Sequence, residues 1–192
     1  MSQWRRNGAG KLIVIPAQRY SRLSVALHWL MLALLVGVYA CIELREMFPK
    51  GSEPRELMKA WHFTLGLTVF VLVWVRLAAK ILGNRPPIVP PAPKWQMLLA
   101  QVVELALYGL MIVLPLLGWL TLSAEGEAIP FFGLQVSALV SQNKELAERI
   151  EGVHVVLATS GYFLIALHTL AALFHHYVRR DNTLKRMLPF GA

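Results

Sequence analysis

The sequence predicts an all-α fold, an integral membrane four-helix bundle, on three observations. Hydrophobic residues make up 56% of the 192 residues and charged residues only 16%, against about 45–50% and about 25% in soluble domains. Four segments approach or exceed the roughly 20 apolar residues that a membrane-spanning helix needs. The excess of basic residues falls on alternate connections between these segments. Together these features exclude a disordered chain, a disulfide-rich secreted domain and an ordinary soluble enzyme.

The four expected spans are the apolar segments themselves. They cover residues 23–42, 61–82, 97–122 and 153–177. Pro115 should bend the third span without ending it. The second span contains Arg76 and Lys80 near its end, and their long side chains can extend to a membrane interface. The connection between the third and fourth spans is the longest, and residues 145–151 in it could form a short surface helix.

The distribution of charge predicts the orientation in the membrane. The segment before the first span carries +5, and the second connection and the tail carry +3 each. The first connection is neutral and the third carries −3. By the positive-inside rule, both termini and the proline-rich second connection are cytoplasmic, in a bacterial inner membrane. The net charge of +8 is therefore explained by topology, and no nucleic-acid partner is expected.

The chain divides into a basic cytoplasmic extension, residues 1–19, and one four-span domain, residues 20–192. The apolar run Leu12–Ile15 is shorter than the 7–15 residues of a signal-peptide core. We therefore expect the first span to act as an uncleaved membrane anchor. Cys41 is the only cysteine, which excludes an intrachain disulfide.

Histidines at matched depths are the main functional signal. The six histidines, all in or at the ends of spans, are His28, His62, His154, His168, His175 and His176. His154 and His168 are fourteen residues apart, close to four helical turns, so they face the same way about 21 Å apart. His62 shares the outer depth of His154, and His28 shares the inner depth of His168. An ionisable residue inside a membrane indicates a functional site, although a single histidine could instead make an interhelical hydrogen bond.

Two facing histidine pairs in an apolar bundle are the ligand set of two haems with bis-histidine ligation. The sequence has no Cys-x-x-Cys-His, so each haem would be b-type and non-covalent. A zinc or copper ion would need its ligands in one coordination sphere, which the fourteen-residue separation prevents. Small residues near the ligands could leave room for the flat cofactor or serve ordinary helix packing. They are Gly66, Gly109, Gly118, Ala158, Gly161 and Ala171.

Two further residues allow two interpretations each. His175 lies two turns beyond His168 and could donate a proton to a quinone, or could simply interact with the helix dipole at the C-terminus. Arg22, before the first span, could likewise contact a quinone or only the membrane interface.

Several motifs resemble the bacterial cytochrome b561 family. They are Tyr20-Ser21-Arg22-Leu23 with His28-Trp29, Gly161-Tyr162-Phe163 with His168, His175-His176-Tyr177, Asp181-Asn182-Thr183-Leu184 and Arg186-Met187. The resemblance covers about residues 20–189 and implies a membrane bundle enclosing two b-type haems. It implies that the axial ligands are paired His28 with His168 and His62 with His154, and that Arg22 and His175 lie near a quinone.

The resemblance also implies an activity: superoxide is oxidised to dioxygen on the periplasmic side, and ubiquinone is reduced. The basic residues that could steer superoxide to the outer haem are Arg45 and Lys50, with Arg55 and Lys59 beside them. Acidic residues are interleaved with these four, and Glu151 lies just before His154. A second hypothesis is an electron-transfer and anchor subunit for a periplasmic dehydrogenase or hydrogenase. A third is a transporter or structural bundle without a cofactor.

Overall fold

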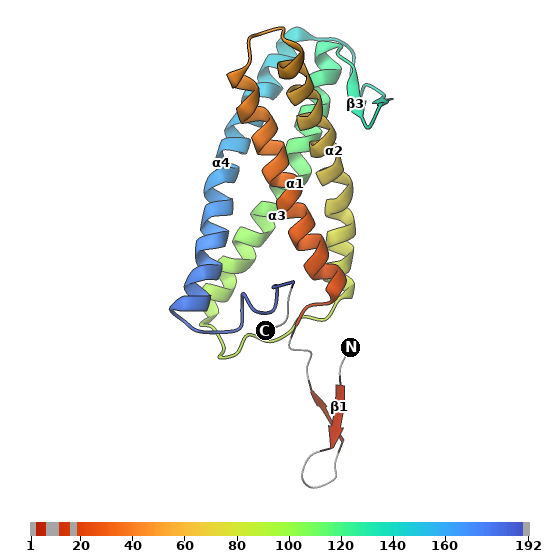
Figure 1. Ribbon diagram of the computed structural model, residues 1–192. Coiled ribbons are helices and arrows are strands. Elements are labelled where there is room, and N and C mark those ends of the chain that lie inside the picture. Colours follow the sequence, from red (N-terminus) through yellow and green to blue (C-terminus); the bar gives the residue numbers. More distant parts are fainter. Residues whose placement is uncertain (1–2, 7–11, 16–18, 190–192) are drawn as a thin grey trace.

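Four long helices dominate the computed structural model, which describes residues 3–6, 12–15 and 19–189 (Figure 1). The helices are α1 (Arg22–Leu44), the short 3₁₀ helix η1 (Arg45–Met47), α2 (Glu53–Leu82), α3 (Lys94–Glu125) and α4 (Lys144–Tyr177). Two antiparallel strand pairs join β1 (Gln3–Arg6) to β2 (Leu12–Ile15), and β3 (Ile129–Phe131) to β4 (Leu134–Val136). All four long helices are long and apolar enough to cross a membrane. The predicted membrane four-helix bundle is confirmed.

The two ends of the bundle differ. The chain enters α1 and leaves α4 at one end, which we call the terminal end (Figure 1). The α1–α2 and α3–α4 connections lie at the opposite end, the loop end, where β3 and β4 form a small hairpin. The β1–β2 hairpin lies beyond the terminal end (Figure 1). The expected basic extension is described only at these two strands and Arg19, and its Lys11 lies outside the described residues.

Two of the four long helices, α1 and α4, begin at a residue whose side chain caps them. The Ser21 hydroxyl accepts a hydrogen bond from the Ser24 amide at 3.1 Å at the start of α1, and Asn143 accepts one from the Leu146 amide at 3.0 Å at the start of α4. Such caps satisfy amides that have no partner within the helix. Because α4 starts at Lys144, residues 145–151 are its first two turns and not the separate surface helix that the sequence suggested. α3 continues through Pro115, as predicted.

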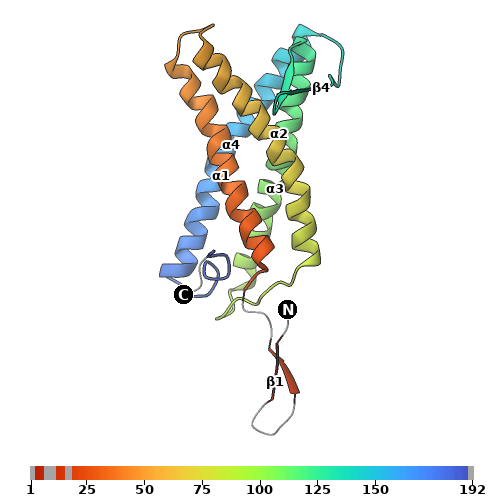
Figure 2. The ribbon, with the colours of Figure 1, turned by 45° about the vertical axis from the view of Figure 1, so that its right-hand side comes forward.

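The helices pack in sequence order around a small apolar core. α1 packs against α2, α2 against α3 and α3 against α4, and Met31, Val69, Val73 and Tyr108 are buried together between them. α1 and α4 make no direct backbone contact, so long side chains bridge the distance between them. Figure 2 shows α1 and α2 diverging from α3 and α4 toward the loop end. Large apolar side chains lie on the outside, as lipid requires.

The C-terminal segment, residues 178–189, closes the terminal end. Its Asn182 accepts a hydrogen bond from the Val89 amide at 2.8 Å in the proline-rich connection. Arg186, only 7% exposed, donates to the Pro86 carbonyl in the same connection. The indole nitrogen of Trp29 in α1 donates to the Met187 carbonyl at 2.8 Å. The motif residues Asn182, Arg186 and Met187 thus fasten three distant parts of the chain together.

Candidate functional site

The structure brings four histidines together as two pairs, one above the other along the bundle. The rings of His28 in α1 and His168 in α4 have centroids 6.2 Å apart, with a 58° angle between their planes. The rings of His62 in α2 and His154 in α4 have centroids 6.3 Å apart, at 68°. The first pair lies toward the terminal end and the second toward the loop end, as the depth argument from the sequence predicts. We call them the inner pair and the outer pair.

The separation within each pair fits a metal held between two imidazoles. With metal–nitrogen bonds of about 2 Å, as for zinc, two end-on rings place their centroids about 6 Å apart. In the outer pair, His62 Nδ1 donates to the Val38 carbonyl at 2.9 Å. This hydrogen bond fixes the tautomer and leaves Nε2 free as a ligand, the arrangement that metal-binding histidines usually show. His154 Nδ1 is buried without a hydrogen-bond partner among the described residues.

The small residues that the sequence singled out have different surroundings. A Cβ added at Gly66 or Gly109 would meet no atom within 4 Å, and one at Gly118 would lie 3.7 Å from the His154 ring. Gly66 and Gly109 thus have open space beside them, whereas the 3.7 Å distance at Gly118 is ordinary van der Waals packing. Gly161 is different, because an added Cβ would lie 2.4 Å from the Tyr39 hydroxyl.

Tyr39 accounts for that close approach. Its hydroxyl donates to the Ala158 carbonyl at 2.8 Å, so it reaches from α1 to the α4 backbone between the two histidine pairs. The Tyr162 hydroxyl donates to Glu43 at 2.7 Å and so joins α4 back to α1. Ala158 and Gly161 therefore serve helix packing here, while Ala171 is exposed.

The two basic residues in the second half of α2, Arg76 and Lys80, both bind partners on neighbouring helices. Arg76 Nη2 donates to His28 Nδ1 at 2.9 Å, so the prediction that Arg76 reaches the interface is wrong. Lys80 forms an ion pair with Glu104 of α3 at 2.7 Å and lies 5.0 Å from the centre of the Tyr108 ring. Arg76 and Lys80 bind these partners because an ionised side chain in a membrane segment is costly unless a nearby group pairs with its charge. The only signal in the sequence was an arginine directly after the apolar run that ends at Val75.

Beyond the inner pair, His175 has a carboxylate partner that the sequence did not identify. His175 Nδ1 hydrogen-bonds to Asp181, whose side chain is buried and also accepts from the Thr183 amide at 2.9 Å. Burial raises the pKa of Asp181, but the hydrogen bonds from His175 and Thr183 outweigh it and hold the pKa below its usual value. This carboxylate therefore stabilises the folded state above its unfolded pKa of about 3.9, and that stabilisation is lost as the pH falls through the lower folded pKa.

The other residues predicted for the terminal end lie apart from this pair. Arg22 is exposed at the first position of α1 and makes no hydrogen bond or ion pair with another described residue. His176 Nδ1 is buried and has no hydrogen-bond partner among the described residues.

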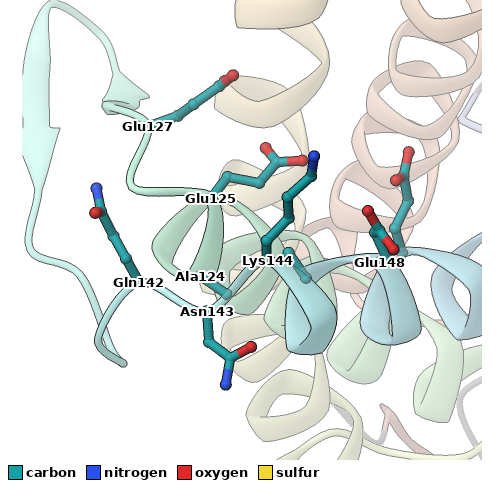
Figure 3. A pocket seen from close by; sticks show the side chains of 9 residues that line it. Ala124, Glu125, Glu127, Gln142, Asn143, Lys144 and Glu148 are labelled. Carbon is teal, nitrogen blue, oxygen red and sulfur yellow. The ribbon is translucent and has the colours of Figure 1, made fainter.

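The loop end carries more acid than base. Arg45 is paired with Glu46 at 3.0 Å, and Glu46 also accepts from Arg55 at 2.8 Å. Lys50 is exposed in the turn before α2. A pocket between the end of α3 and the start of α4 is lined by glutamates (Figure 3). Its charged lining residues are Glu125, Glu127, Lys144, Glu148 and Glu151.

Comparison with known proteins gives a consistent result over nearly the whole chain. The family model of prokaryotic cytochrome b561 matches residues 19–190. Cytochrome b561 homolog 1 of Escherichia coli (strain K12) is 44% identical over 171 residues, covering 89% of this chain and 97% of that protein. Probable superoxide oxidase CybB of Yersinia pestis is 39% identical over 172 residues, covering 90% and 97%. Cytochrome b561 homolog 2 of Escherichia coli (strain K12) is 29% identical over 176 residues, covering 89% and 92%.

Proposed function

Because the chain belongs to the prokaryotic cytochrome b561 family of membrane electron-transfer proteins, which bind haem b, we propose that it holds two haem b groups and transfers electrons across the membrane to a quinone. The axial ligands are His28 with His168 and His62 with His154. The observation that carries the proposal is the pair of ring separations, 6.2 and 6.3 Å, at two levels of one bundle. When bound, haem b supplies reversible one-electron transfer.

We propose superoxide as the electron donor and ubiquinone as the acceptor. Two superoxide anions lose one electron each and become dioxygen, while one ubiquinone takes up those two electrons and two protons to become ubiquinol. The relative named a probable superoxide oxidase, at 39% identity, supports this substrate. The positive-inside rule supports cytoplasmic termini, which assigns the loop end to the periplasm and the terminal end to the cytoplasm. Arg45 and Lys50 are then on the superoxide side, and Arg22 and His175 on the quinone side.

The residues of the terminal end can supply the protons that quinone reduction consumes. His175 Nδ1 hydrogen-bonds to Asp181, which fixes the orientation of the ring, as a carboxylate does for a catalytic histidine. His175 would donate a proton to a quinone oxygen from Nε2. The buried carboxylate keeps its charge at neutral pH, so it can orient the ring through repeated cycles.

The first test is spectroscopic. We expect the purified chain to contain two haem b per chain and superoxide to reduce both, as seen in reduced-minus-oxidised spectra. Lys50→Glu should slow this reduction more at low than at high salt, because an exposed charge that steers an anion is screened. A chain without haem would contradict the cofactor assignment. Two haems that superoxide leaves oxidised would contradict the substrate alone.

A second test concerns the quinone side. We expect His175→Ala to lower the rate of ubiquinone reduction by about 100-fold, the usual range for losing a general acid, with haem content unchanged. Asp181→Asn keeps the shape of the side chain and removes its charge, and should give a smaller loss in the same direction. His176→Ala, one residue along α4, is the matched control and should reduce quinone normally. Unchanged quinone kinetics in His175→Ala would leave this histidine only its interaction with the helix C-terminus.

A second candidate function has one observation in its favour. The acidic pocket at the loop end lies on the first turns of α4, the helix that carries His154 (Figure 3). Acidic side chains would repel superoxide but would suit a basic protein that delivers electrons, as in an anchor subunit for a periplasmic dehydrogenase or hydrogenase. Full superoxide activity of the isolated chain would exclude this alternative, and co-purification with a second subunit would favour it.

A further inference from the structure

Arg76 is a cation inside the bundle that has no acidic partner among the described residues. Its Nη1 is buried without a hydrogen-bond partner, and its Nη2 donates to His28 Nδ1 at 2.9 Å. The other cation in this part of α2, Lys80, is neutralised by Glu104 at 2.7 Å. The half-buried guanidinium lies 5.9 Å from the centre of the Tyr108 ring, but a charge withdrawn from water without a counter-charge is destabilising. The structure therefore indicates an anion that Arg76 binds and that the described residues do not supply.

The hydrogen bond between Arg76 and His28 cannot persist when His28 binds iron through Nε2. Arginine only donates, so His28 Nδ1 must be the acceptor, and the proton of the neutral ring lies on Nε2. A ligating histidine has the opposite tautomer and donates from Nδ1, as His62 does to the Val38 carbonyl. Two donors would then face each other. Loading the inner pair thus frees Nη2 as well, and both nitrogens of the Arg76 fork require a new acceptor.

Haem b brings two propionate carboxylates, which are anionic at neutral pH, and arginine binds carboxylates with two parallel hydrogen bonds. We propose that Arg76 binds a propionate of the haem held by His28 and His168. This inference rests on the proposed function, because it requires a haem at the inner pair. The guanidinium also raises the reduction potential of that haem, because a nearby positive charge stabilises the form with one more electron. Electrons arriving from the loop end are thereby favoured to move to the terminal end.

The test is an optical redox titration of the purified holoprotein and its variants. In Arg76→Gln, we expect the ratio of reduced to oxidised inner haem at a fixed ambient potential to fall about tenfold, equivalent to 59 mV for a one-electron couple. The outer haem should not change. Arg76→Lys keeps the charge and should shift the ratio by less than threefold. The double variant Lys80→Gln with Glu104→Gln removes a neutral ion pair from the same part of the bundle and should leave both potentials unchanged.

The outcomes separate this inference from the proposed function. A wild-type chain that binds fewer than two haems would refute the proposed function and, with it, the premise. If the wild type binds two haems and the reduction potential of the inner haem is unchanged in Arg76→Gln, the inference alone is overturned. The same holds if the only effect of Arg76→Gln is a higher KM for quinone. If Arg76→Gln does not accumulate, the vibrational bands of the haem carboxylates in wild type and Arg76→Lys decide the question. The carboxylate bands of wild type and Arg76→Lys should differ, because the substitution replaces a guanidinium that donates two parallel hydrogen bonds by a single ammonium group. Identical bands would overturn the inference.

Discussion

Replacing His62 with alanine is expected to remove one haem per chain and leave the other in place. The outer pair has one ring on each side, with centroids 6.3 Å apart, and alanine deletes one of the two ligands. It also removes the hydrogen bond to the Val38 carbonyl that holds the ring in its tautomer. Second-sphere changes alone typically cost 10–100-fold in metal affinity, so deleting the ligand should empty the site. The measurement is haem per chain, which should fall from two to one.

The identity of the lost haem provides the control. His168→Ala should remove the inner haem, so the two variants should leave haems with different spectra and potentials. His176→Ala removes a half-buried imidazole from α4 that belongs to neither pair, and it should retain both haems. Loss of both haems from His62→Ala would contradict two independent sites.

Gly161→Ala is expected to destabilise the bundle by about 1–3 kcal/mol, the usual cost of overpacking. The added Cβ would lie 2.4 Å from the Tyr39 hydroxyl, which cannot withdraw without breaking its hydrogen bond to the Ala158 carbonyl. The effect should appear as a lower Tm in detergent.

The same helix offers a control for this second variant. Gly152→Ala places a methyl group where no atom lies within 4 Å and should be neutral or slightly stabilising, because alanine favours helix. Tyr39→Phe removes the clashing oxygen, so Gly161→Ala should cost less in that background. An equal cost in both backgrounds would show that Tyr39 is not the obstacle.

The membrane fold and the histidine pairs were predictable, because hydropathy and the helical repeat are local properties of the sequence. The fourteen-residue separation of His154 and His168 is enough to predict that both face the same way. The span boundaries are enough to predict which histidines lie at the same depth. The helix starts were not predictable from hydropathy. Polar turns such as those that begin at Glu53 and Lys144 continue the helices beyond the apolar segments, where hydropathy carries no information.

The partners of long polar side chains were the other feature that the sequence did not predict. Arg76 sits near the end of its span and could extend either way, and its partner His28 is 48 positions away in the sequence. Asp181 lies in a motif but gives no local sign that it orients His175. In each case the deciding contact joins elements that only the assembled bundle brings together.

The hydrogen bond between the Trp29 indole and the Met187 carbonyl can form only late in biosynthesis, because the two residues are 158 positions apart. At about 5–20 residues per second, Met187 leaves the ribosome roughly 8–30 s after Trp29. Through this interval α1 can already be inserted in the membrane while the C-terminal segment that covers the terminal end has not yet been made. The inner pair is complete only when His168 has been made, 19 residues before Met187, so it exists for about 1–4 s at this rate before the C-terminal segment can dock across the terminal end.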